Sequence, residues 1–275
     1  MPTAEIIAVG NELLNGDVQD TNTHWLCRRL TGLGATVRHC ATVRDDEPAI
    51  AAEVSASLAR DADLVVTTGG MGPTQDDLTL SAVATAVGVG LAIDERALTM
   101  VTDKYRELAA DGHVESADIT ASRKKMSMLP EGATPLANPV GAAPGVLLEV
   151  QNAIIVCVPG VPAELQGIVN TSLAPTLRRL FGSASFVEDE VVAHVGDESV
   201  LAPALAEVAA QHPGVYVKSR PKRFGPDVRI RITVSARGSS EDEASGEVAS
   251  ALRSLRRALA ARGISCSTDS SSTAV

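Results

Sequence analysis

The chain has 275 residues, of which 45% are hydrophobic and 21% charged, and its formal net charge is −10. This apolar fraction is typical of a globular protein and excludes a wholly disordered chain. No apolar run approaches the roughly 20 residues that a membrane-spanning helix needs, which excludes an integral membrane protein of that kind. Net acidity argues against a nucleic-acid binder, because such proteins present a basic surface.

The cysteines and the N-terminus bear on compartment. There are four cysteines at long, irregular spacings, without a Cys-x-x-Cys pair, so we expect no zinc site. The first residues, Met-Pro-Thr-Ala-Glu, contain neither a basic nor an apolar segment of a secretory signal. We therefore expect a cytoplasmic protein with reduced thiols.

The N-terminal part predicts strands that alternate with helices. Short apolar runs over 5–10, 36–43 and 63–68 predict three strands, and helices are predicted to begin near Thr21, Pro48 and Thr79. This alternation is the signature of parallel βαβ units with right-handed crossovers. The sequence therefore predicts an α/β domain with a mostly parallel sheet.

The remainder predicts the end of this domain and a second one. A mainly helical stretch over 94–127 precedes two strands, 145–150 and 153–158, which we expect to form an antiparallel hairpin at the sheet edge, followed by one helix over 163–180. Shorter strands and helices then predict a small α+β unit. The expected organisation is a domain over 1–182, a second over 183–263, and a disordered Ser/Thr-rich tail over 264–275.

The most informative loop follows the third strand and reads Gly69-Gly70-Met71-Gly72-Pro73-Thr74-Gln75-Asp76-Asp77. Ligands of open parallel sheets bind beyond the carboxyl ends of the strands. Glycines allow a close backbone approach to a phosphate, and Thr74 adds a hydroxyl donor. Asp76 and Asp77 either hold a divalent cation that bridges to the phosphate or favour the start of the next helix. Their spacing alone leaves these two interpretations equal.

Acidic loops also follow the first two strands. The first strand leads into Gly10-Asn11-Glu12 and then Asp20-Thr21-Asn22, and the second leads into Asp45-Asp46. For the segment from Asp20, helix capping is favoured over ligand contact. Carboxylates at three successive strand ends nevertheless favour a metal-assisted phosphate site.

Three further segments carry weaker signals. The turns Asn138 to Gly145 and Pro159 to Leu165 either present backbone amides to a ligand or serve only as turns. The basic run Arg123-Lys124-Lys125 either neutralises a polyphosphate or forms a solvated helix face. The chain lacks a P-loop lysine, the Gly-x-Gly-x-x-Gly fingerprint and a Gly-x-Ser-x-Gly elbow, which weakens kinase, Rossmann dehydrogenase and serine-hydrolase interpretations.

Taken together, these segments resemble the molybdopterin-binding (MoaB/Mog-like) domain, and most closely the N-terminal region of the CinA (competence/damage-inducible protein A) family. The resemblance rests on residues 9–14, 20–22, 69–77, 138–145 and 159–164, in matching order over about 1–175. It implies a three-layer α/β domain with a mostly parallel sheet, followed by a small KH-like α+β domain over 186–262. The deamidase domain of that family has no counterpart here, so amide hydrolysis is not expected.

The resemblance also implies an activity: a metal-dependent nucleotide pyrophosphatase acting on ADP-ribose or FAD. Asp77 and Asp76 then occupy the catalytic and metal-binding position with Glu12 as a further metal ligand, and Mg²⁺ is expected, with Mn²⁺ or Co²⁺ as alternatives. Asp45 falls at another functional position, although Asp46 aligns equally well, and Lys124 or Arg123 is expected to stabilise charge on the transferring group. The expected substrate-binding set is Gly10, Asn11, Glu12, Asp20, Asn22, Gly69, Gly70, Met71, Gly72, Thr74, Arg123, Asn138, Gly141, Pro159 and Gly160. Gln75, Ser122 and Lys125 depart from the family pattern and leave the substrate open.

Two other functions stay open. One is pterin binding or adenylyl transfer in molybdenum cofactor synthesis, and the other is nucleotide binding without turnover. The KH-like part lacks the Gly-x-x-Gly loop of RNA-binding relatives, and Arg220, Lys222 and Arg223 form only a small basic cluster, so nucleic acid is not expected as a partner. The expected partners are a small nucleotide or pterin ligand and, by family resemblance, a second copy in a homodimer.

Overall fold

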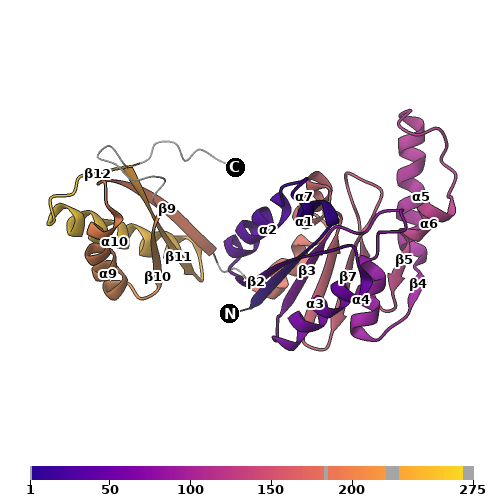
Figure 1. The fold of residues 1–275 in the computed structure, drawn as a ribbon, viewed down its shortest axis with the longest axis horizontal. Helices are drawn as coiled ribbons and strands as arrows, with labels where there is room; N and C mark the ends of the chain where they lie inside the picture. Colours follow the sequence, from indigo (N-terminus) through magenta and orange to yellow (C-terminus); the bar gives the residue numbers. More distant parts are fainter. Residues whose placement is uncertain (1, 183–184, 221–228, 269–275) are drawn as a thin grey trace. The chain divides into compact units, whose positions relative to one another are not determined.

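The computed structural model describes residues 2–182, 185–220 and 229–268 (Figure 1). The chain forms two compact units, one made of residues 1–31 and 35–181 and the other of residues 32–34 and 182–275. None of the helices in the described part combines the length and the apolar character that a membrane crossing requires.

The first unit is built on a six-stranded sheet in the order β2-β1-β3-β8-β7-β6. Four strands are parallel: β2 (Thr36–Val43), β1 (Thr3–Val9), β3 (Leu64–Thr68) and β8 (Ala153–Val158). The antiparallel strands β7 (Gly145–Val150) and β6 (Thr134–Leu136) complete the sheet. All five residues of β3 are buried, as expected for a central strand covered on both faces. The predicted α/β class with a mostly parallel sheet is confirmed.

Helices cover both faces of this sheet. They are α1 (Asn11–Asn15), α2 (Thr21–Gly32), α3 (Glu47–Ala59), α4 (Thr79–Val87), α5 (Glu95–Ala110), α6 (Ala121–Lys125), α7 (Pro162–Asn170) and α8 (Ala174–Phe181). The chain steps from β1 out to β2 and then back across β1 to β3. Right-handed crossovers in opposite directions place their helices on opposite faces, and Figure 1 shows α2 on one side of the sheet and α3 on the other. Ile7 and Val9 of β1 pack with Ile50 and Val54 of α3 in one of the resulting cores.

Two predictions for this unit are corrected. The hairpin of β7 and β8 is antiparallel but does not form the sheet edge, because β6 pairs with the outer side of β7. The helix predicted over 163–180 is two helices, since Thr171 leaves the helical region and a new helix begins at Ala174 with Pro175 in its first turn. The stretch 94–127 is mainly helical, as predicted, and its helices are α5 and α6. The strands that precede and follow that stretch in the chain, β4 (Leu91–Ile93) and β5 (Met128–Pro130), pair to form a separate two-stranded sheet.

The second unit is a four-stranded antiparallel sheet with helices packed against it. The strand order is β10-β11-β9-β12, and the elements are β9 (Ser185–His194), η1 (Glu198–Val200), α9 (Ala202–Gln211), β10 (Val215–Arg220), β11 (Arg229–Gly238), α10 (Glu241–Ala260) and β12 (Cys266–Thr268). The predicted disordered tail is therefore wrong for residues 266–268, which pair with β9. Residues 269–275 lie outside the described residues, as do Lys222 and Arg223 of the basic cluster, whereas Arg220 is exposed at the end of β10.

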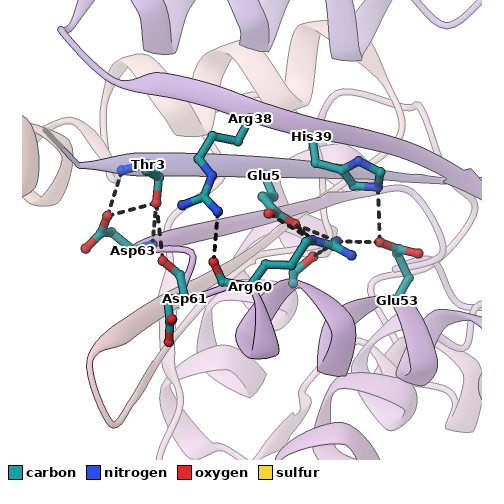
Figure 2. Close-up of polar contacts among 9 residues, drawn as sticks. Thr3, Glu5, Arg38, His39, Glu53, Arg60, Asp61 and Asp63 are labelled. Atoms are coloured by element: carbon teal, nitrogen blue, oxygen red, sulfur yellow. Dashed lines mark hydrogen bonds and ion pairs between the residues drawn. The ribbon is translucent and has the colours of Figure 1, made fainter.

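Near the amino end of β1, a network of charged side chains joins the sheet to α3 (Figure 2). The Glu5 side chain is only 1% exposed and accepts hydrogen bonds from Nε and Nη2 of Arg60, at 3.0 and 2.6 Å to Oε2. Arg60 Nη2 also lies 2.7 Å from Glu53 Oε1, which is 3.3 Å from Nε2 of His39. Ligand-binding loops leave the carboxyl ends of the strands. This network lies toward the amino ends, so it stabilises the fold away from those loops.

Candidate active site

The predicted loops meet at a cavity of about 580 Å³ at the carboxyl ends of the parallel strands. Strands β1 and β3 are direct neighbours, and the chain reverses its direction across the sheet between them. Such a reversal opens a crevice between adjacent loops. Twelve residues predicted for the site line the cavity: Glu12, Asp20, Asn22, Asp45, Gly69, Gly70, Met71, Gly72, Asp76, Asp77, Pro159 and Gly160.

The glycine-rich loop is held in a conformation that only glycine adopts easily. Gly69 has a φ of +102°, and a methyl carbon there would lie 2.2 Å from the carbonyl oxygen of Val9. Thr79, at the start of α4, donates its hydroxyl to the Gly69 carbonyl and its N–H to the Gly70 carbonyl, at 2.8 and 3.1 Å. Thr79 is fully buried, so these bonds fix the loop against α4.

Asn22 joins three loops behind the cavity. Its amide nitrogen donates to Thr68 Oγ1 at 3.0 Å and to the Gly160 carbonyl at 2.7 Å. The Thr68 hydroxyl in turn donates to the carbonyl of Pro159. Asn22 therefore links the start of α2 to the ends of β3 and β8, which gives this predicted binding residue a positioning role.

Asp77 is held by Thr74 at the rim of the glycine-rich loop. The backbone N–H and the hydroxyl of Thr74 donate to Oδ2 of Asp77, at 2.8 and 2.5 Å. Gly72 makes room for this carboxylate, since a methyl carbon there would lie 2.7 Å from Oδ2. Thr74 itself lines a neighbouring cavity on the other side of the loop, together with Lys125.

Lys125 is the lysine that reaches this loop. Its ammonium group donates to the carbonyl of Thr74. A hydrogen bond from the Thr74 side chain and the charge of Lys125 both help to hold the pKa of Asp76 below its ordinary value. Lys124, which the sequence predicted to act on the transferring group, is exposed and lines neither of these two cavities. Of these two lysines, Lys125 and not Lys124 places its positive charge at the glycine-rich loop.

The two aspartates after β2 have different roles. Asp45 lines the cavity and accepts a hydrogen bond from the Asn11 N–H at 2.8 Å, while Arg44 contacts the Asn11 side chain at 3.2 Å. Asp46 caps α3 by accepting from the Ala49 N–H. The structure thus places Asp45 at the site. Asn11 and its neighbour Gly10 do not line the cavity, although they support the loop that does.

The remaining carboxylates of the first loop differ from one another. Asp20 Oδ1 accepts from the Thr23 N–H at 2.9 Å, which agrees with helix capping, and its side chain also lines the cavity. Glu12 is exposed, and its carboxylate lies beside Gly10, where a methyl carbon would come within 2.5 Å of Oε1.

Glu164 is a cavity residue outside the predicted site set, although it ends the segment 159–164 on which the family resemblance partly rests. Its Oε2 accepts a hydrogen bond from Asn138 Nδ2 at 2.7 Å, and Asn138 Oδ1 accepts from the Gly141 N–H at 2.9 Å. Burial raises the pKa of Glu164, and the Asn138 bond and the charge of Lys104 partly offset this effect. Asn138 and Gly141 thus position Glu164 and do not themselves line the cavity.

Tyr105 is the second cavity residue outside the predicted site set. It comes from α5, and Arg123 stacks on its ring at 3.9 Å from the centroid. Arg123 also donates to the carbonyls of Ser116 and Asp118, each at 2.7 Å, so its guanidinium group braces the ring instead of lining the cavity.

The oxygen donors of the cavity are carboxylates and backbone carbonyls, the ligand types that hard divalent cations prefer. Among the described residues, no three His, Cys, Asp or Glu side chains lie close enough together to hold a metal ion by themselves. Mg²⁺ is commonly held by one or two carboxylates, with substrate phosphates and water as its other ligands. Any divalent cation in this cavity would therefore need oxygen ligands from a bound phosphate or from water, besides one or two of the carboxylates.

Comparison with known families gives one match that spans most of the first unit. Residues 5–179 match the family described as "Probable molybdopterin binding domain". A protein of Pyrobaculum calidifontis is 43% identical over 256 residues, covering 93% of this chain and 95% of that protein. A protein of Aeropyrum pernix is 42% identical over 272 residues and covers 98% of both chains, so the similarity includes the second unit.

One solved structure supports the fold of the first unit in particular. The crystal structure of the protein CinA, of unknown function, from Thermoplasma acidophilum is 35% identical and superposes with a TM-score of 0.58. It covers 64% of this chain and 98% of the Thermoplasma chain.

Proposed function

The chain belongs to the family of probable molybdopterin binding domains, and from this premise we propose that it is a nucleotide pyrophosphatase that uses a divalent cation. The substrate we propose is ADP-ribose or a nucleotide of the same class, such as FAD. The products are then AMP and a second phosphate ester.

One observation carries this proposal: the cavity brings carboxylates from four loops around a glycine-rich backbone. The carboxylates are Glu12, Asp20, Asp45, Asp76, Asp77 and Glu164. A cavity so rich in negative charge repels a polyphosphate unless a cation bridges the two. A glycine-rich loop alone would suit phosphate binding without a metal, so the combination favours metal-assisted chemistry.

The residues divide the work as follows. Asp76 and Asp77 are proposed to hold the cation together with substrate phosphates and water, and Thr74 keeps Asp77 in position through its two hydrogen bonds. Glu12, the third ligand expected from the sequence, does not lie close enough to both aspartates to complete a three-carboxylate site. A cation bound there polarises a phosphoryl oxygen of the substrate. The backbone of 69–72 holds the phosphates, and Lys125 contributes positive charge at the rim. Tyr105 is proposed to provide an aromatic surface for the heterocycle, and Arg123 holds the ring in place by stacking on it.

The direct test is product analysis. Pure protein is incubated with ADP-ribose, FAD or ATP and with Mg²⁺, Mn²⁺ or Co²⁺, and AMP is measured by chromatography. We expect AMP release that Asp77→Asn lowers about 100-fold or more, because a carboxylate contact to the cation is lost.

The matched control is Asp46→Asn. It removes the same charge, but from the loop after β2 and not from the loop after β3. Asp46 caps α3, and asparagine caps helices equally well, so the fold should be kept. We expect it to retain full activity. Intact nucleotides with every metal, or equal loss in the two variants, would contradict the proposal.

A second candidate rests on the family description itself, which names molybdopterin. Pterin binding or adenylyl transfer would use the same loops to build a phosphoanhydride instead of breaking one. Tight binding of a pterin with no AMP release from any nucleotide would favour it.

A further inference from the structure

Cys27 on α2 and Cys40 on β2 form a pair of adjacent thiols. Their Sγ atoms are 3.6 Å apart, and Cys40 is exposed while Cys27 is half-buried. A disulfide bond is about 2.05 Å long, so the sulfurs need to approach by only about 1.5 Å to form one. Because β2 is an end strand of the sheet, this pair is accessible to small molecules from solvent.

The surroundings of the two sulfurs favour ionisation of Cys27 over that of Cys40. The hydrogen bond from Cys40 lowers the pKa of Cys27 to about 7, against the opposing effects of burial and of the negative charge of Asp20. The same hydrogen bond raises the pKa of Cys40. Since the thiolate is the nucleophile, Cys27 is the attacking sulfur and Cys40 the second one. Cys157, in contrast, is fully buried, and burial raises its pKa to about 11.

We propose that Cys27 and Cys40 are a modification site at which a small-molecule disulfide oxidises the pair to an intramolecular disulfide. The Cys27 thiolate attacks one sulfur of the small disulfide, which forms a mixed disulfide and releases one small thiolate. Cys40 then loses its proton to water and attacks Sγ of Cys27, forming the Cys27–Cys40 bond and releasing the second small thiolate. The protein loses two electrons and two protons, and the small disulfide is reduced to two thiols.

This bond would tie together two elements that lead to the cavity. Helix α2 begins beside Asn22, and β2 runs toward Asp45. The bond closes a short loop between residues 13 positions apart, which reduces the conformational freedom of the unfolded chain. The oxidised protein should therefore unfold at a higher temperature, by about 5 °C or more.

The test uses the full chain, reduced and then treated with glutathione disulfide. After acid quenching, the free thiols are labelled with a maleimide under denaturing conditions and counted by mass spectrometry. We expect four labels before oxidation and two after it, a peptide that joins Cys27 to Cys40, and the rise in unfolding temperature. Cys40→Ser should stop at a glutathione adduct on Cys27, and Cys266→Ser should form the bond as the wild type does.

Four labels after oxidation would overturn the proposal. So would a glutathione adduct that persists on Cys27 of the wild type, or a disulfide between Cys27 and another chain. The proposal does not depend on the pyrophosphatase activity, because the readouts are thiol number and unfolding temperature.

Discussion

The carboxylate of Glu164 occupies the space that a side chain at residue 141 would need. A methyl carbon on Gly141 would lie 2.1 Å from the carboxyl carbon of Glu164. The colliding atoms are the end of a flexible side chain and not backbone. Alanine at this position should therefore move the carboxylate and leave the fold in place.

From this relationship we expect Gly141→Ala to lower AMP release about 10-fold, because Glu164 loses its place beside Asn138. The free energy of unfolding should fall by only about 1 kcal/mol, the typical net value of one hydrogen bond. Glu164→Gln keeps an oxygen for the Asn138 bond and removes only the charge. Equal activities of Gly141→Ala and the wild type would show that the position of Glu164 does not matter.

The adjacent lysines Lys124 and Lys125 provide a matched pair of variants. Lys125→Met removes the charge at the glycine-rich loop and should lower AMP release at least about 10-fold, because that loop is proposed to hold the phosphates. Lys124→Met removes the same charge one residue away, on an exposed side chain, and should leave the rate within about 2-fold. Steady-state kinetics of both variants decide between them. The reverse order would favour the prediction made from sequence resemblance.

Gly69 should be the glycine least tolerant of replacement in the site loop. Gly69→Ala combines a positive φ with a contact to the Val9 carbonyl that the backbone cannot relieve. We expect the free energy of unfolding to fall by more than about 3 kcal/mol. Gly16→Ala is the control: its φ is +79° but nothing lies within 4 Å, so the loss should be about 1 kcal/mol. Denaturant unfolding measures the free energy of unfolding of both variants. Similar losses would show that the loop can shift to accommodate a methyl group at residue 69.

Glu5 should make stability depend on pH in the acidic range. Burial raises the pKa of its carboxyl, but the hydrogen bonds from Arg60 and Ser57 and the charge of Arg60 more than offset this and bring the pKa below its ordinary value of 4.5. A carboxylate with a lowered pKa stabilises the fold fully above about pH 4.5 and loses that contribution as the pH falls through its folded value.

Glu5→Gln should therefore cost about 2 kcal/mol at pH 7, a value reduced from that of a fully buried pair because Arg60 is partly exposed. The cost should shrink at pH 3. Urea unfolding of wild type and variant at both pH values measures it, and a cost that is the same at pH 3 and pH 7 would mean that packing, not charge, explains the effect.

Much of the first unit follows from local patterns in the sequence. Buried runs such as 64–68, alternating with amphipathic helices, fix a parallel sheet, because a strand covered on both faces must be apolar throughout. Right-handed crossovers then bring the loops after β1 and β3 together. Hence the position of the glycine-rich loop at the site, and most of the carboxylates that line the cavity, could be predicted from the sequence.

What the sequence could not predict depends on contacts between distant residues. Tyr105 reaches the cavity from α5, and no local pattern marks a tyrosine on an amphipathic helix as a wall of a site. The strand over 266–268 forms only because β9 offers it a partner.

The sequence by itself determined the fold class, the loop that contains Gly69 to Asp77 and the end of the sheet where it lies, because these depend on periodicity and strand direction. Only the tertiary structure decided that Asp45 faces the cavity while Asp46 caps a helix, that Lys125 and not Lys124 reaches the loop, and that Glu164 belongs to the site. Adjacent residues of the same chemical type are indistinguishable in sequence, and the direction of a side chain is set by the backbone that surrounding elements impose.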